Sequence, residues 1–104
     1  MATILAGSDR ATALLGLPGW GNCADQDAIT KSFHFHDFAQ AFAFMTEMAL
    51  VAQRLNHHPD WSNSYNRVDL TLTTHDVGGI TANDIRLAHA AEDAARGRVK
   101  ATPE

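Results

Sequence analysis

The sequence is short of cysteine and of clustered positive charge, and both shortages argue against whole classes of protein. Its single cysteine, Cys23, cannot form an internal disulfide and suits a reducing compartment. The formal net charge is -4 at pH 7 and no Lys/Arg cluster is present, whereas nucleic-acid binding depends largely on basic residues that release counterions. The composition therefore argues against direct binding to nucleic acid or to an acidic membrane surface, and it favours a cytoplasmic location.

Long apolar runs are also missing. The first 17 residues include apolar side chains, but Asp9 and Arg10 interrupt them and no cationic stretch precedes a long apolar segment. Neither a signal peptide nor a membrane-spanning segment is therefore expected. The chain has 104 residues, 45% of them hydrophobic and 19% charged, as is usual for a globular domain with a modest core. We expect one domain over residues 1–104, with a short extension at 1–7 and a frayed tail at 98–104.

The first half of the chain predicts two helices and two strands. A short helix over residues 8–15, with Ser8 as its N-cap, precedes a short strand that begins near Trp20. Residues 28–36 alternate between apolar and polar side chains, which predicts a half-buried strand. A long helix over residues 37–56 follows, with a broad apolar face suited to lying across a sheet. That face consists of two rows, Phe38, Phe42, Met45, Ala49 and Ala52, and Ala41, Phe44, Met48, Val51 and Leu55.

The second half predicts a hairpin and a last helix. Residues 61–66 and 68–74 indicate two strands joined by a tight turn. Thr81 and Asp84 form a capping box ahead of a helix over residues 81–97. The predicted class is α+β, a two-layer domain of order α-β-β-α-β-β-α, in which a four-stranded antiparallel sheet has helices packed on one face. Its bare sheet face and edge strands would favour self-association.

Three of the six histidines stand at turn-like positions between the predicted elements. His57 and His58 follow the long helix, and His75 ends the last strand. Loops on a rigid frame are common places for reactive groups. Because the unperturbed pKa of histidine is about 6.5, a pair of imidazoles facing a substrate can act as general acid and general base. The neighbouring side chains that could hydrogen-bond a polar heterocycle are Asn56, Thr73, Thr74 and Asp76.

The same residues have other interpretations. One alternative is that the two adjacent histidines before Pro59 only form an exposed turn. Three histidines with Asp76 or Asp84 could in principle make an open zinc centre. The sequence nevertheless has neither a helical His-x-x-x-His nor a cysteine pair, so we expect no metal. Asp84 also has a structural explanation, because an acid in the first turn of a helix is favourable at its positive end.

Three short segments together make a specific pattern. They are Asn56-His57-His58-Pro59-Asp60-Trp61, Tyr65-Asn66-Arg67-Val68 and Leu72-Thr73-Thr74-His75-Asp76. These segments resemble the pterin-4a-carbinolamine dehydratase family, and residues 33–45 and 81–85 resemble its strand-to-helix segment and the start of its final helix. The likeness spans about residues 20–92. Asp60 and Asp76 stand where many relatives carry glutamate, and Ser62 and Ser64 replace bulkier residues in the first hairpin strand.

The resemblance implies a fold and a reaction. The implied fold is a four-stranded antiparallel sheet backed by helices, assembled into homodimers or homotetramers. The implied enzyme is a hydro-lyase, 4a-hydroxytetrahydrobiopterin dehydratase, which needs no metal or organic cofactor. It converts a 4a-hydroxytetrahydropterin to quinonoid dihydropterin and water, and so recycles tetrahydropterin for aromatic amino acid hydroxylases.

The resemblance also assigns roles to residues. The family's three active-site histidines fall on His57, His58 and His75, and its associated acid falls on Asp84. We expect His58 or His75 to protonate the departing 4a-hydroxyl while a partner accepts the N5 proton, with His57 binding and orienting. The residues expected to contact the pterin are Asn56, His57, His58, Pro59, Thr73, Thr74, His75 and Asp76.

A second function belongs to a different class. Some animal members of the family also serve as dimerisation cofactors for a homeodomain transcription factor, so this chain could be mainly a binding module with little catalysis. The presence of His57, His58 and His75 favours the enzyme, because a pure interaction role does not need them.

Overall fold

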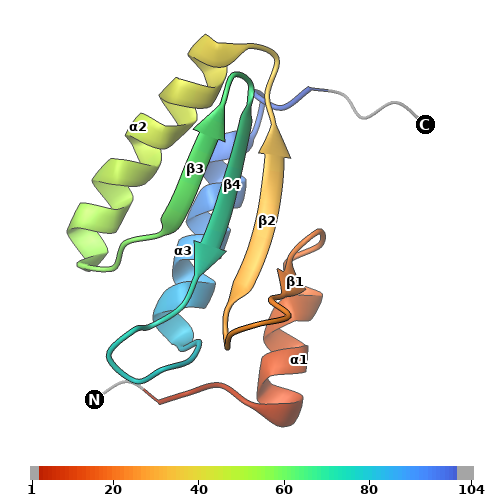
Figure 1. The fold of residues 1–104 in the computed structure, drawn as a ribbon, viewed down its shortest axis with the longest axis vertical. Coiled ribbons are helices and arrows are strands. Elements are labelled where there is room, and N and C mark those ends of the chain that lie inside the picture. The colour runs from red at the N-terminus through yellow and green to blue at the C-terminus, as the bar shows by residue number, and fades with distance from the viewer. Residues whose placement is uncertain (1–2, 101–104) are drawn as a thin grey trace.

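The computed structural model describes residues 3–100, which form three helices and one four-stranded antiparallel sheet (Figure 1). The elements in chain order are α1 (Gly7–Leu15), β1 (Gly21–Asn22), β2 (Ile29–His34), α2 (Phe38–Leu55), β3 (Asp60–Ser64), β4 (Arg67–Leu72) and α3 (Ala82–Ala95). The strand order across the sheet is β1-β2-β4-β3. The helices α2 and α3 pack against each other and against β4. The predicted α+β class and order of elements are confirmed.

Alternation along the two central strands builds the core. The strand β4 buries Val68, Leu70 and Leu72, and its antiparallel neighbour β2 buries Ile29 and Phe33. These side chains point to the same face because every second residue of a strand does so. Each one contributes about 1.5–3 kcal/mol when fully buried. The other sheet face is left polar.

A hydrogen-bonded carboxylate marks that polar face. Asp69 on β4 accepts a hydrogen bond from the Ser32 hydroxyl at 2.5 Å. It also accepts from the Nε and Nη2 atoms of Arg67 at 2.9 to 3.1 Å. The Arg67 guanidinium, the Ser32 hydroxyl and the nearby His34 together hold the pKa of Asp69 below its ordinary value.

We predict that this carboxylate contributes to the free energy of unfolding and that its contribution is lost in acid. Because the pKa of Asp69 is depressed in the folded state, its stabilisation is fully present above the unfolded value of about 3.9 and is lost as the pH falls through the lower folded value. We expect Asp69→Asn to be less stable than wild type near neutral pH and to lose less further stability between about pH 5 and pH 3. Urea unfolding measures the free energy of unfolding of both proteins over that pH range. If it fell equally with pH in the two proteins, the prediction would be contradicted.

The long helix α2 begins where the sequence predicts. Asp37 is its N-cap, and the carboxylate accepts a hydrogen bond from Gln40 N at 2.8 Å. The helix ends at Leu55, and Asn56 follows in the left-handed conformation with a φ of 52°. That conformation turns the chain sharply, so His57 and His58 leave the helix axis. Within the part of the chain that the structure describes, no helix is both long and apolar enough to cross a membrane.

The buried stripe of α2 is narrower than the two predicted rows. Its fully buried residues are Ala41, Phe44, Met48 and Ala52. Phe38 and Phe42 are 48% and 56% exposed, although their rings contact each other, with centroids 5.9 Å apart. The prediction of a broad face lying across the sheet is therefore wrong for these two side chains, and also for Ala49, which is exposed. Phe38 and Phe42 form an apolar surface that no other part of residues 3–100 covers.

The structure differs from the prediction near both ends of the described chain. The N-cap of α1 is Ala6 rather than Ser8, which lies inside the helix. The frayed tail predicted from residue 98 is wrong for residues 98–100. There, His36 N donates to Arg98 O at 3.1 Å and Lys100 N donates to His34 O at 2.9 Å, which extends the edge of β2. Residues 101–104 lie outside the described residues.

Candidate active site

Two segments meet at one end of the sheet to form a pocket of about 220 Å³. Its lining residues are Asn56, His57, His58, Asp60, Thr73, Thr74, His75 and Asp76. They meet because β3 and β4 are antiparallel neighbours, with Asp60 paired to Thr71, so the start of β3 lies beside the end of β4. The structure thus brings together seven of the eight predicted pterin contacts. Pro59 is not among the lining residues.

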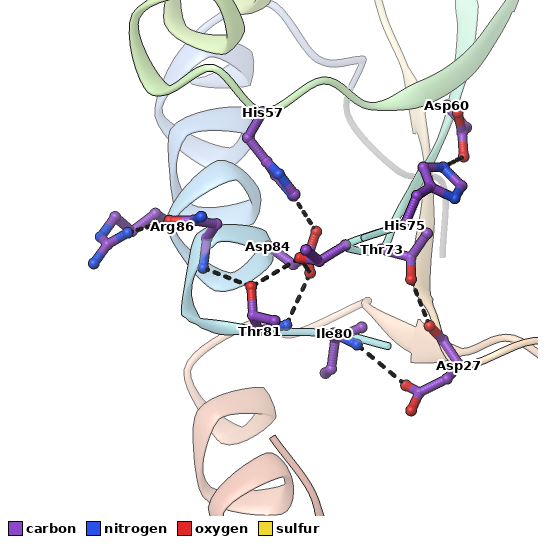
Figure 2. Close-up of polar contacts among 11 residues, drawn as sticks. Asp27, His57, Asp60, Thr73, His75, Ile80, Thr81, Asp84 and Arg86 are labelled. Carbon is purple, nitrogen blue, oxygen red and sulfur yellow. Dashed lines mark hydrogen bonds and ion pairs between the residues drawn. The ribbon is translucent and has the colours of Figure 1, made fainter. Parts of the chain in front are cut away.

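Asp60 is the lining residue that sequence reasoning missed. Its carboxylate Oδ2 lies 3.1 Å from Nε2 of His75 (Figure 2). Both side chains are exposed, at 58% and 69%. The signal that could have identified Asp60 is its place at the first position of the hairpin. In an antiparallel pair, the residue that starts one strand faces the residues that end the other.

Asp84 stands behind the pocket and holds His57. Its Oδ1 atom lies 2.5 Å from Nε2 of His57, whose side chain is only 11% exposed. Its Oδ2 atom accepts a hydrogen bond from Thr81 N at 2.9 Å (Figure 2). The same atom accepts from the Thr74 hydroxyl at 2.7 Å. The capping box predicted for Thr81 and Asp84 is confirmed. One buried carboxylate therefore joins the start of α3, the end of β4 and His57.

A closed loop carries His75 and Asp76. Thr74 N donates to Gly79 O at 3.0 Å, and Gly79 N donates back to Thr74 O at 3.4 Å. Between these two residues the chain turns, with Gly78 at a φ of 75°, where a side chain would be strained. The imidazole of His75 is thus presented from the base of a short loop whose two ends are bonded together.

The geometry divides the three histidines into two kinds. His57 is largely buried, and Nε2 is occupied by Asp84, so its ring orientation is fixed. His58 and His75 are exposed at the pocket, where a ring nitrogen can exchange a proton with a ligand. Among residues 3–100, no three His, Cys, Asp or Glu side chains are grouped closely enough to hold a metal ion.

A larger depression lies elsewhere, along β2 and the end of α3. Its volume is about 370 Å³, and its charged lining residues include Lys31, Glu92, Arg96 and Lys100. Lys31 is already paired with Glu92 at 2.6 Å. We locate the candidate active site at the smaller pocket, because three histidines and two carboxylates converge there.

Comparison with known proteins identifies the family. A family model described as pterin 4 alpha carbinolamine dehydratase matches residues 4–94. The chain belongs to this family. A relative from Rhizobium rhizogenes, provisionally named as a pterin-4-alpha-carbinolamine dehydratase, is 55% identical over 83 residues, which are 80% of this chain and 82% of the relative. A similarly named relative from Burkholderia vietnamiensis is 54% identical over 84 residues, or 81% and 82% of the two chains.

Solved structures of dehydratase-like proteins share the fold. A crystal structure from Brucella melitensis, described as a transcriptional coactivator/pterin dehydratase, superposes with a TM-score of 0.87 at 46% identity. The match covers 89% of this chain and 99% of that chain. A pterin dehydratase-like protein described as a RuBisCO assembly factor in the alpha-carboxysome has a TM-score of 0.65 at 22% identity, covering 75% and 90%. That second likeness shows the fold alone.

Proposed function

We propose that this chain dehydrates a 4a-hydroxytetrahydropterin to quinonoid dihydropterin and water, and so recycles tetrahydropterin for aromatic amino acid hydroxylases. The observation that carries the proposal is the meeting of His57, His58 and His75 at one pocket in a member of the pterin-4a-carbinolamine dehydratase family. The pocket is smaller than the usual ligand site of about 300–1,000 Å³. It therefore suits a flat bicyclic ring that binds partly at the surface.

The reaction needs two proton transfers. The C4a–O bond breaks as the hydroxyl gains a proton and leaves as water, and N5 loses its proton as the C4a=N5 double bond forms. We assign these transfers to His58 and His75, one as acid and one as base, because both imidazoles are exposed at the pocket. His57 binds and orients the pterin, since Asp84 fixes its ring. Asp84 thus supports the reaction through His57.

Pocket residues and the adjacent Pro59 supply the proposed contacts to the pterin. The proposed contacts are Asn56, His57, His58, Pro59, Thr73, Thr74, His75 and Asp76. The Thr73 hydroxyl donates to Asp27 O at 2.7 Å, and the Thr74 hydroxyl donates to Asp84. Their hydrogens are therefore engaged within the protein. We assign the hydrogen bonds that recognise the polar edge of the pterin mainly to Asn56 and Asp76.

The proposal extends to assembly and location. We propose a homodimer or homotetramer in the cytoplasm. Self-association is supported by the exposed side chains of Phe38, Phe42 and Leu50 on α2, which are 48%, 56% and 63% exposed. The single cysteine supports a reducing compartment. The same apolar surface also supports the alternative function, a binding module with little catalysis, which the description of the Brucella melitensis structure includes as coactivator.

A rate measurement in the presence of EDTA tests the proposed enzyme. Purified protein is added to freshly generated 4a-hydroxytetrahydropterin, and the decay is compared with the uncatalysed reaction. We expect strong acceleration by wild type, its loss in the double variant His58→Ala/His75→Ala, and its retention in His36→Ala/His89→Ala, which removes two histidines outside the pocket. If well-folded wild type gave no acceleration, the dehydratase proposal would be wrong and the binding module would replace it.

A further inference from the structure

Asp27, which lies outside the pocket, contacts both ends of the segment that carries His75. Its main-chain carbonyl accepts a hydrogen bond from the Thr73 hydroxyl at 2.7 Å, on the chain entering the loop. Its carboxylate Oδ1 accepts from Ile80 N at 3.4 Å, on the chain leaving the loop (Figure 2). A single residue therefore spans the base of the loop on the side away from Asp84.

Gly79 allows this close approach. A Cβ atom built on Gly79 would lie only 2.7 Å from the Oδ2 atom of Asp27 and 3.3 Å from Cδ1 of Ile4. Real Cβ atoms do not come so close to an oxygen, so any side chain here would displace the carboxylate. Gly79 also pairs with Thr74 to close the loop. The Asp27 carboxylate thus rests directly against the residue that closes the loop.

Arg10 fixes the Asp27 carboxylate from the other side. Its Nη1 atom donates to Oδ1 of Asp27, and its Nε and Nη2 atoms donate to Asn22 Oδ1 at 3.0 and 2.8 Å. The hydrogen bond from Arg10 holds the pKa of Asp27 below its ordinary value, so the carboxylate is charged at neutral pH. The helix α1, which carries Arg10, buries none of its own residues fully and lines no part of the pocket.

We propose that Asp27 is a positioning residue for the reaction, which holds both ends of residues 73–80 and so fixes the placement of His75 at the pocket. Arg10 fixes the Asp27 carboxylate, and through it α1 supports the site without touching substrate. The inference rests on the proposed dehydratase function. It adds a residue and a helix that neither the pocket lining nor the family motifs include.

The test compares Asp27→Ala and Asp27→Asn with the matched control Asp69→Asn. Like Asp27, Asp69 is a carboxylate paired with an arginine, and its substitution removes that ion pair. Asp69 lies on the polar sheet face away from the loop. Three quantities are measured under conditions where urea unfolding shows each protein to be fully folded: kcat and KM, the NMR signal of the His75 ring, and amide exchange at Gly79 and Ile80. Arg10→Lys, which keeps the positive charge, is compared with Arg10→Ala.

We expect Asp27→Ala to lower kcat by up to about 100-fold, because misplacing a reacting group by about 1 Å can cost that much. The His75 ring signal should shift, and amide exchange at Gly79 and Ile80 should speed up. Asp27→Asn should lower kcat less than Asp27→Ala does, because the amide keeps one acceptor oxygen. Arg10→Lys should retain more activity than Arg10→Ala, and Asp69→Asn should keep kcat within about twofold of wild type.

Two outcomes would overturn the inference. One is an unchanged His75 signal with unchanged loop exchange in folded Asp27→Ala. The other is faster loop exchange with kcat equal to that of Asp69→Asn, which would reduce Asp27 to a structural contact. If wild type itself lacked dehydratase activity, the proposed function would fail separately, and the ring signal and loop exchange would still decide whether Asp27 positions His75.

Discussion

Replacing His75 by alanine is expected to lower kcat for dehydration of a 4a-hydroxytetrahydropterin by about 100- to 10,000-fold, the usual contribution of one general acid or base. The free energy of unfolding should change by less than about 0.5 kcal/mol, as for most exposed positions. The reason is that the His75 side chain is 69% exposed and its partner, Asp60, is also on the surface. Activity and stability should therefore separate cleanly at this residue.

Steady-state kinetics and urea unfolding of the same preparations check this expectation. His36→Ala is the matched control, because His36 is equally a surface histidine but follows β2 outside the pocket. Asp60→Asn should lower kcat less than His75→Ala, since the imidazole remains and only its carboxylate neighbour is lost. A His75→Ala variant within threefold of wild type would contradict the role assigned to this residue and leave His58 as the remaining candidate.

Replacing Asp84 by alanine is expected to lower the free energy of unfolding by about 3–5 kcal/mol. The carboxylate is fully buried and bonded to three groups, which are Thr81 N, the Thr74 hydroxyl and His57 Nε2. Each buried group left without a partner costs about 1–3 kcal/mol. The capping box of α3 also loses the half that Asp84 supplies. Activity should fall as well, because nothing then fixes the ring of His57.

Two matched variants make this measurement specific. Asp84→Asn should lower the free energy of unfolding by less, about 1–3 kcal/mol. The amide keeps one oxygen, so only some of the donors lose their acceptor. Asp93→Ala removes an acid from the same helix, where the ion pair with Arg96 is exposed, and should cost under about 1 kcal/mol. A loss of less than 1 kcal/mol for Asp84→Ala, from unfolding curves of unchanged m-value, would show that the network carries little stability.

The features predicted correctly from the sequence are those that local chemistry determines. The alternation of Val68, Leu70 and Leu72 with polar residues indicates a half-buried strand by itself, and the structure buries all three. The Asp37 cap and the capping box of Thr81 and Asp84 involve groups within three residues of each other. Such short-range patterns need no knowledge of the rest of the fold.

The features that the sequence did not predict depend on distant partners. The pairing of Arg98 and Lys100 with the end of β2 joins residues about 60 positions apart. Asp60 reaches His75 only because β3 and β4 are antiparallel neighbours. The exposure of Phe42 depends on what packs against α2, and an apolar row on a helix does not distinguish a core from a surface that awaits a partner.

The candidate site was predictable in part. The histidines were suggested by their turn-like positions and by the family resemblance, and the structure places them together. The attachment of Asp84 to His57 was not predicted by spacing, because 27 residues separate the two. Asp27 gave no signal, since an acid in a polar loop is ordinary until its contacts with the distant segment that carries His75 are visible.

The buried carboxylate of Asp84 also constrains how descendants of this protein can diverge. A lineage that loses Asp84 gives up both half of the capping box of α3 and the contact that holds His57, so selection for a stable fold retains it even where turnover no longer matters. The exposed imidazoles of His58 and His75 carry no such structural duty. A descendant that keeps the fold only for binding can therefore replace those two histidines. Asp84 would remain in such a protein because it still stabilises the fold.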